Sequence, residues 1–217
     1  MSVNVTTVVV GDMEENCHIV RNGADEALVI DPGAEAEKIV EAIEATAATP
    51  LAILLTHAHF DHIGAVEPLK SRYRLPLYLH KKEEKLLKSA NLYTHLFGKG
   101  GKVAIPKVDY YVDRLENPFS IGMFAVRTIE TPGHTKGGVT FAIGDAAFTG
   151  DTLLKGATGS LKFPGANKEL LIESLKTLAT LPPETRVYAG HGEPTTISEE
   201  LETNERFQKA LSKGVEE

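Results

Sequence analysis

Three histidines and one aspartate crowd into six consecutive positions of the chain. The segment reads Thr56-His57-Ala58-His59-Phe60-Asp61-His62, and it directly follows the apolar run 51–55. Polar side chains at the end of a buried strand are costly unless they are hydrogen-bonded or bind something. Imidazole and carboxylate together are ligands that zinc, iron and manganese accept. The pattern therefore predicts a metal site rather than a histidine-rich surface loop.

The spacing of these residues leaves room for a second ion beside the first. His57 and His59 are two residues apart, so in extended backbone their side chains point to the same side. Asp61 and His62 lie where the chain turns toward an expected helix, which directs them to a second ion nearby. Four residues cannot complete two coordination shells, and turns with Gly or Pro after other expected strands supply more ligands. These turns are Thr131-Pro132-Gly133-His134-Thr135, Thr149-Gly150-Asp151-Thr152 and Ala189-Gly190-His191-Gly192.

Alternating strands and helices are expected to position these turns. The patterns predict strands at 3–10, 17–20, 27–30, 51–55, 77–79, 123–129, 139–143, 146–149 and 186–189. They predict helices at 34–47, 61–73, 81–89, 168–178 and 198–211, and a loop over 91–106. Two strand-rich halves that each carry helices favour an α/β (α+β) fold in one domain, 1–217, with two mixed sheets packed face to face and helices outside.

Composition narrows the range of partners. The 217 residues are 42% hydrophobic, which is enough for a substantial core, and 23 basic against 30 acidic residues give a net charge of −7. That balance argues against nucleic acid as a partner. Because the start of the chain lacks a signal-peptide pattern and no apolar run approaches membrane-helix length, we expect a cytoplasmic protein with no membrane partner. The single cysteine, Cys17, is expected in the core.

The candidate ligands resemble those of the metallo-β-lactamase-fold hydrolases, and most of all their glyoxalase II (hydroxyacylglutathione hydrolase) branch. The similarity extends from Asn16-Cys17 through Asp31-Pro32-Gly33 to the segment 181–191. It implies an αβ/βα four-layer sandwich with a binuclear site at one edge of the sheets. Two divalent ions are implied, zinc first, with iron or manganese as alternatives. Of the matching residues, His57, His59 and His134 would hold one ion, Asp61, His62 and His191 the other, and Asp151 both.

The resemblance also implies a reaction, the hydrolysis of a small acylthiol. A hydroxide shared by two ions is available near neutral pH, because metal binding lowers the pKa of water from 15.7 to about 7. Asp61 would act in catalysis as the ligand that orients this hydroxide. Thr56 and Thr135 are candidates for hydrogen bonds that fix the imidazoles. The expected partner is therefore a small-molecule acylthiol substrate, and the oligomeric state stays open.

The sequence departs from glyoxalase II around the substrate. Only 26 residues follow His191 (217 − 191), so we expect the C-terminal helical domain that binds glutathione in those enzymes to be absent. Lys162-Phe163 matches part of a Lys-Phe-Tyr segment that contacts the thioester, which makes both residues candidates for substrate binding. Gly192-Glu193 follows the last histidine where glutathione-binding relatives have a tyrosine. Whether glutathione is the thiol is therefore left open.

Two other activities on the same fold compete with thioester hydrolysis. A persulfide dioxygenase-like enzyme needs one iron, and His57, His134 and Asp151 would form its 2-His-1-carboxylate set. A lactone or phosphoester hydrolase would use the same hydroxide with a different pocket. A binding module without catalysis is disfavoured, because such a protein would have lost ligands and none is missing.

Overall fold

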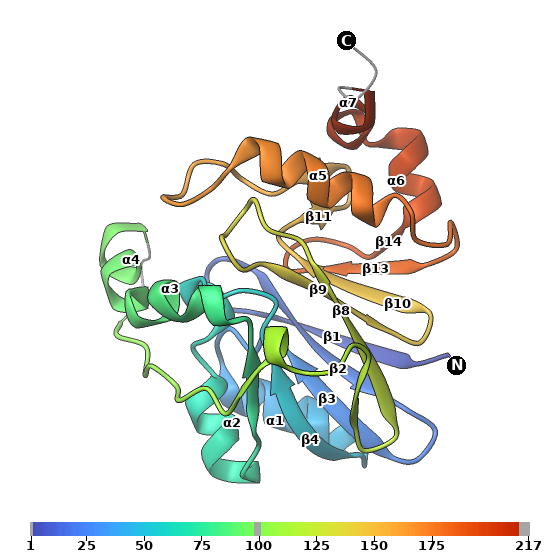
Figure 1. The fold of residues 1–217 in the computed structure, drawn as a ribbon. Coiled ribbons are helices and arrows are strands. Elements are labelled where there is room, and N and C mark those ends of the chain that lie inside the picture. Colours follow the sequence, from blue (N-terminus) through green and yellow to red (C-terminus); the bar gives the residue numbers. More distant parts are fainter. Residues whose placement is uncertain (1, 98–100, 213–217) are drawn as a thin grey trace.

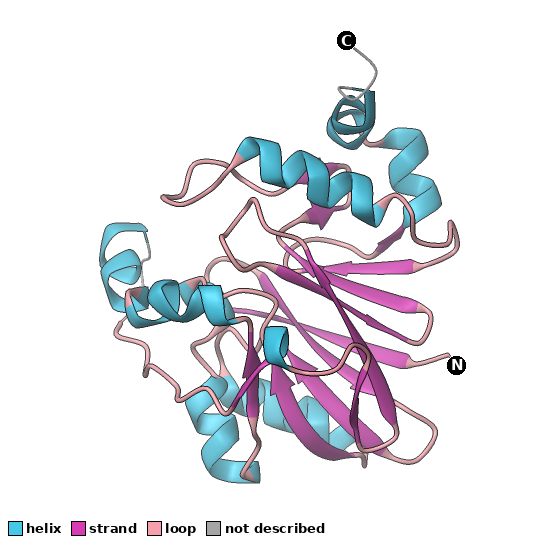
Figure 2. Ribbon diagram, in the orientation of Figure 1, coloured by secondary structure: helices cyan, strands magenta, loops and turns pink. Residues whose placement is uncertain are grey.

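The strands form two large sheets, as the ribbon views in Figures 1 and 2 show. The computed structural model describes residues 2–97 and 101–212. The first sheet has the order β1-β2-β3-β4-β5-β6, with the bounds Asn4–Val10, Glu15–Arg21, Glu26–Ile30, Thr49–Leu54, Leu77–Leu79 and Tyr110–Tyr111. The second has the order β14-β13-β10-β9-β8-β7, with the bounds Thr195–Thr196, Arg186–Ala189, Ala146–Gly150, Val139–Ile143, Phe124–Glu130 and Phe119–Ile121. A small ribbon pairs β11 (Leu153–Leu154) with β12 (Ala157–Thr158).

Both sheets are mixed. In the first sheet β1, β2 and β3 are antiparallel neighbours, whereas β3, β4, β5 and β6 run parallel. In the second sheet only β10 and β13 are parallel. Parallel neighbours bring the carboxyl ends of their strands to the same edge, and that edge carries most of the polar turns identified above.

Side chains alternate between two apolar layers along the central strands. Leu28, Ile30 and Leu54 point into the space between the two sheets, where they meet Phe141 and Phe148 of the second sheet. Their neighbours in the sequence, such as Val29 and Ile53, belong to the layer under the outer helices. This period of two, on strands buried on both faces, explains the near-continuous apolar runs.

Helices cover the outer faces of the sheets. The helices α1 (Ala36–Ala45) and α2 (Val66–Tyr73) pack on the first sheet, and α5 (Lys168–Leu178), α6 (Ile197–Thr203) and α7 (Glu205–Ser212) pack on the second (Figure 1). The short helices α3 (Glu84–Lys88) and α4 (Ala90–Phe97) lie beside the first sheet, and 3₁₀ turns occur at Phe60–His62, Lys81–Glu83 and Val112–Arg114. The predicted four-layer sandwich is confirmed. Over the described residues, none of the helices has the length and apolar character needed to cross a membrane.

Two predicted helices are each divided in the structure. Instead of one helix over 61–73, the chain forms a 3₁₀ turn and then α2, because the Gly64 and Ala65 N–H groups donate to Gly33 and Pro32 rather than to a helical carbonyl. Instead of one helix over 198–211, the chain breaks at Asn204. The buried Asn204 side chain accepts from the Phe207 N–H at the start of α7, which is how asparagine caps a helix.

The predicted loop over 91–106 is wrong in its first part. Residues 90–97 form α4, and residues 98–100 lie outside the described part of the chain. Leu92 and Leu96 of α4 are 57% and 58% exposed, so the helix has apolar residues on its solvent side. Because its apolar residues are not confined to one face, the segment lacks the single apolar stripe by which an amphipathic helix is recognised.

Candidate metal centre

The predicted ligands gather at one edge of the two sheets because each follows a strand that ends there. His57 and His59 follow β4, and His62 stands in the 3₁₀ turn after them. His134 follows β8, Asp151 follows β10 and His191 follows β13. Segments that are more than 130 residues apart in the chain therefore meet in one site (57 to 191).

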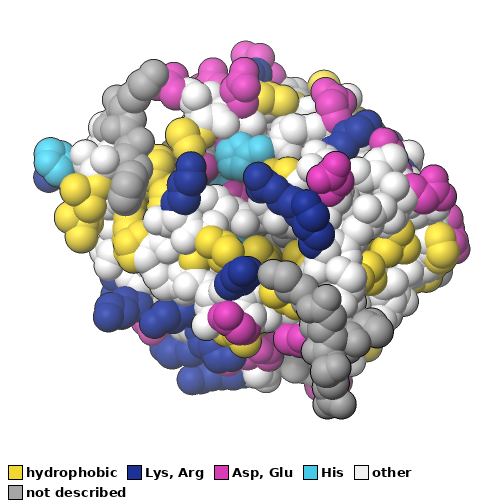
Figure 3. Space-filling model, turned by 90° about the horizontal axis from the view of Figure 1, so that it is seen from above, with side chains coloured by type: hydrophobic (Ala, Val, Ile, Leu, Met, Phe, Trp, Pro, Cys, Tyr) yellow, Lys and Arg dark blue, Asp and Glu magenta, His cyan; other side chains and the backbone are white. Residues whose placement is uncertain are grey.

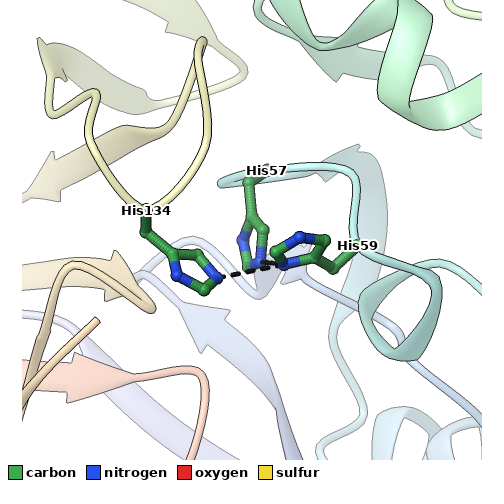
Figure 4. Close-up of side chains that lie close together, drawn as sticks. All are labelled: His57, His59 and His134. Atoms are coloured by element: carbon green, nitrogen blue, oxygen red, sulfur yellow. Dashed lines mark hydrogen bonds between the residues drawn. The ribbon is translucent and has the colours of Figure 1, made fainter. Parts of the chain in front are cut away.

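Three histidine side chains form the first group, which we call the three-histidine cluster: His57, His59 and His134. Their imidazoles point toward one another in Figure 4, and His59 Nδ1 lies 3.0 Å from His57 Nε2 and 3.0 Å from His134 Nε2. All three residues are buried. Four tetrahedral ligands at 2.0–2.1 Å from zinc lie about 3.3 Å apart, so these spacings suit one ion.

Hydrogen bonds fix the orientation of two of these rings. His134 Nδ1 lies 2.8 Å from the Ser160 carbonyl, which can only accept, so the lone pair of this imidazole is on Nε2. Thr56 donates its hydroxyl proton to Asp31 Oδ2 at 2.5 Å and therefore accepts from His57 Nδ1 at 3.1 Å. Both bare Nε2 atoms thus face His59, which is the arrangement that a metal requires.

The environment keeps two of these imidazoles neutral. Burial lowers the pKa of His59 to about 3, and the neighbouring His134 contributes. Burial also lowers the pKa of His57 well below its usual value, with His62 and His59 adding to the effect. Because a protonated imidazole cannot bind a cation, His57 and His59 are held in their binding form.

Asp61, His62 and His191 form the second group, the Asp61 cluster. Asp61 Oδ2 lies 3.4 Å from His191 Nε2 and 3.9 Å from His62 Nε2. His191 Nδ1 lies 3.1 Å from the Met13 carbonyl, so it donates there and leaves Nε2 toward the carboxylate. His62 Nδ1 lies 3.2 Å from Asp31 Oδ2, which likewise leaves its Nε2 toward the site.

In the Asp61 cluster the histidine pKa values are raised, in contrast to those of His57 and His59. Burial disfavours charge on His62, yet Asp61, Asp31 and Asp151 raise its pKa well above the usual value. Burial acts in the same sense on His191, and Asp61 and Asp151 raise its pKa too. Burial of Asp61 opposes ionisation, but His62 and His191 hold the pKa of its carboxyl below the usual value. The cluster therefore attracts positive charge, which a proton or a metal ion can supply.

Asp151 lies between the two groups. Its Oδ2 is 3.4 Å from His134 Nε2 and 3.8 Å from His191 Nε2, and its Oδ1 is 3.7 Å from His62 Nε2. Asp151 Oδ1 and His62 Nε2 are buried, and neither has a hydrogen-bond partner among the described residues. Unpaired buried polar atoms are rare in native proteins, so this pair fits cations held between them. One carboxylate in contact with both groups can serve two ions.

Glycine makes this close approach possible at one position. A Cβ atom on Gly190 would lie 2.4 Å from Asp151 Oδ1 and 2.6 Å from His62 Cε1. Any larger residue there would displace both candidate ligands. The Gly190 beside the last histidine is thus required by packing, as well as by the turn that it permits.

Sequence reasoning missed the acidic residues behind the ligands. The sequence places Asp31 only in a turn, yet it is buried and accepts from Thr56 N–H, Thr56 Oγ1 and His62 Nδ1. Its φ of 49° is unusual for a residue with a side chain and points to a conformation held by these contacts. Glu15 is also buried, and its Oε1 lies 3.6 Å from His62 Nδ1. The one sequence signal for the role of Asp31 is its position in the turn Asp31-Pro32-Gly33, directly after an apolar strand.

A third buried carboxylate joins the loops of the three-histidine cluster. Glu83 Oε2 accepts from the Ala58 N–H at 2.9 Å, and Glu83 Oε1 accepts from the Gly137 N–H at 2.7 Å. Ala58 lies between His57 and His59, whereas Gly137 belongs to the turn that carries His134. Glu83 thus holds the two halves of the cluster together.

The remaining candidates lie around the site in different ways. The Phe163 ring packs 4.8 Å from the His59 ring and 6.1 Å from the His134 ring, between centroids, and Lys162 is exposed beside it. Thr56 bonds to His57 as expected, whereas the Thr135 hydroxyl bonds to no imidazole in the described structure. Three histidines outside the pattern, His18, His80 and His95, belong to neither cluster, and Cys17 is buried as predicted.

The family of this chain follows from its sequence. Residues 10–191 match the model of the metallo-β-lactamase superfamily. The chain belongs to this superfamily. It is similar to the probable metallo-hydrolase YqgX of Bacillus subtilis (strain 168), with 37% identity over 198 residues that cover 90% of this chain and 93% of the relative. This confirms the resemblance found in the sequence, and the protein is a metal-dependent hydrolase of the superfamily.

Two further similar proteins have names that state a substrate or a metal content. The hydroxyacylglutathione hydrolase GloC of Haemophilus influenzae (strain ATCC 51907 / DSM 11121 / KW20 / Rd) is 31% identical over 210 residues, which cover 93% of this chain and 97% of that protein. The crystal structure of TTHA1623 in a di-iron-bound form is 42% identical, with a TM-score of 0.81 over 93% of this chain and 99% of that one. The name of the first protein is that of a hydrolase of hydroxyacylglutathione, and the second structure is of a di-iron-bound form.

Proposed function

We propose that this protein hydrolyses small acylthiols with two divalent metal ions. The observation that carries the proposal is the placement of Asp151 between the three-histidine cluster and the Asp61 cluster, with unpaired buried atoms on Asp151 and His62. The similarity to GloC favours a thioester as substrate, and the similarity to the di-iron-bound TTHA1623 supports two ions. Zinc, iron and manganese all suit imidazole and carboxylate ligands.

In this mechanism the residues of the chain hold the ions and direct the substrate. His57, His59 and His134 would hold one ion, Asp61, His62 and His191 the other, and Asp151 both. Such ions supply a nucleophile at neutral pH, because they lower the pKa of bound water to about 7, and they polarise a carbonyl group. Substrate would approach from the side of Asp61, Asp151 and His191, because their side chains are 11%, 16% and 23% exposed whereas His62 is fully buried.

A cavity beside Asp61 suits the acyl group. It measures about 530 Å³ and is bordered by Asp61 and by apolar residues, among them Val10, Met13 and Phe60. Three further charged residues, Asp12, Glu35 and Lys102, also line the cavity. Apolar walls with a few polar groups are typical of pockets for small molecules. The ring of Phe163 covers the opposite group, the three-histidine cluster, and would contact the thiol half of the substrate.

Metal analysis and a thioester panel test the proposal together. Purified protein saturated with zinc or iron should contain about two ions per chain and hydrolyse S-lactoylglutathione or a neutral thioester of lactate. His191→Ala should lower turnover by about 100-fold or more, because even residues behind the ligands contribute 10- to 100-fold. His95→Ala is the matched control, since His95 is exposed and belongs to neither cluster.

Three results would contradict the proposal, the first two in favour of another reaction and the third against the two-ion mechanism. One tightly bound iron with persulfide-dependent oxygen uptake would make the protein a dioxygenase. Turnover of lactones or phosphoesters without turnover of thioesters would make it a different hydrolase. Near-native activity of His191→Ala in a protein with one ion would remove the two-ion mechanism.

A further inference from the structure

A second cavity lies on the other side of the segment that holds His134. It measures about 540 Å³ and is enclosed by α5, α7 and residues 158–162. We call it the basic cavity, because four of its twelve lining residues are cationic and none is acidic: Lys162, Lys168, Arg206 and Lys209. A group of four cations is unusual in a chain with a net charge of −7. Its volume is in the range of small-molecule sites.

The charges of the basic cavity are available to a ligand. Lys209 forms an exposed ion pair with Glu205 at 3.5 Å. For Lys162, Lys168 and Arg206, no ion pair is formed with any residue in the ranges 2–97 and 101–212. The floor between them is apolar, with Leu171 and Leu175 of α5. Figure 3 shows the face that carries α5 and α7, on which basic side chains gather around a histidine.

The basic cavity is directly linked to the metal centre. Gly159 lines the cavity, and a Cβ atom placed on it would lie 3.0 Å from His134 Cβ. The Ser160 carbonyl accepts from His134 Nδ1. Two residues later Lys162 lines the cavity, and Phe163 after it contacts the His59 ring. One short segment therefore contacts a candidate ligand on one side and the cationic wall on the other.

We propose that the basic cavity binds the arm of a phosphorylated thiol, the leaving half of the thioester. This inference rests on the proposed function. An arm with two negative charges and an apolar chain matches several cations over an apolar floor. Glutathione matches less well, because its ammonium group would meet four cations and no carboxylate in this cavity.

Three thioesters of lactate that differ only in the arm test the assignment. The thiols are N-acetylcysteamine (neutral), glutathione (one net negative charge) and 4′-phosphopantetheine (a phosphomonoester). We expect the phosphorylated thioester to have the lowest KM. The double variant Lys168→Ala/Arg206→Ala should raise that KM about tenfold, at three- to fivefold for each exposed pair, and leave the neutral thioester unchanged. Lys176→Ala is the matched control on α5, since Lys176 does not line the cavity.

Direct binding separates a failure of this inference from a failure of the proposed function. Calorimetric titration with 4′-phosphopantetheine should show binding that the double variant weakens about tenfold, and this readout does not depend on hydrolysis. Binding of 4′-phosphopantetheine without any thioester turnover would refute the proposed function but support the assignment of the basic cavity. Thioester turnover with equal KM for all arms, or unchanged in the double variant, would overturn the assignment. A preference for the glutathione arm that the double variant abolishes would overturn the phosphorylated class.

Discussion

Glu83 should be essential for the metal centre although it is not a candidate ligand. The variant Glu83→Gln keeps one acceptor oxygen but turns an amide NH₂ toward either the Ala58 or the Gly137 N–H. One hydrogen bond to a charged group is lost, which costs about 1.5–3 kcal/mol. Burial raises the pKa of Glu83, so removal of the buried charge offsets part of that loss. We expect a free energy of unfolding lower by about 2 kcal/mol, and for a chain of this length a Tm lower by about 4–8 °C.

The same variant should weaken metal binding, because the loops of His57, His59 and His134 are then no longer tied to each other. We expect at least about a tenfold loss of affinity, measured by competition with a chromophoric chelator. Glu84→Gln is the neighbouring control, since the ion pairs of Glu84 with Lys81 and Lys88 lie at the surface and contact neither loop. An unchanged Tm together with unchanged metal affinity in Glu83→Gln would refute the role assigned to this residue. A lower Tm with unchanged affinity would limit Glu83 to folding.

Two further predictions concern pH. Protons compete with metal at His62 and His191, whose pKa values are raised, before they compete at His57 and His59, whose pKa values are lowered. Metal content measured after dialysis at decreasing pH should therefore fall in two steps, and release of both ions in one step would contradict the difference between the clusters. Burial also lowers the pKa of His18 from 6.5 to about 4. Below pH 6.5 this imidazole is therefore protonated in the unfolded chain but stays neutral in the folded chain. Metal-free protein should lose about 2 kcal/mol through His18 between pH 7.5 and pH 5, and His18→Gln, compared by urea unfolding, should lack this part of the pH dependence.

Much of the architecture could be predicted because it depends on local patterns. The unbroken apolar runs of β3 and β4 and the apolar stripe of α1 can be recognised within short stretches of sequence. The helix breaks after His62 and at Asn204 could not be predicted in this way. Both depend on partners elsewhere: the carbonyl of Gly33 in the first case, and in the second the carbonyls of Leu154 and Ala157, which bind the Asn204 amide.

The metal centre also contains residues that the sequence reveals and residues that it does not. Its candidate ligands could be found because histidine and aspartate next to strand-ending turns are unusual, and His57 and His59 share a face by simple alternation. The carboxylates of Asp31 and Glu83 could not, because each acts on groups distant in the sequence, and an isolated Asp or Glu is far more often a surface residue. Asp31 orients His62 directly and His57 through Thr56, and one oxygen, Oδ2, accepts both of these hydrogen bonds. Asp31 therefore links the two clusters from behind, and Asp151 contacts both of them from within the site. A change at Asp31 should therefore disturb both clusters together, whereas loss of His191 should disturb only the Asp61 cluster.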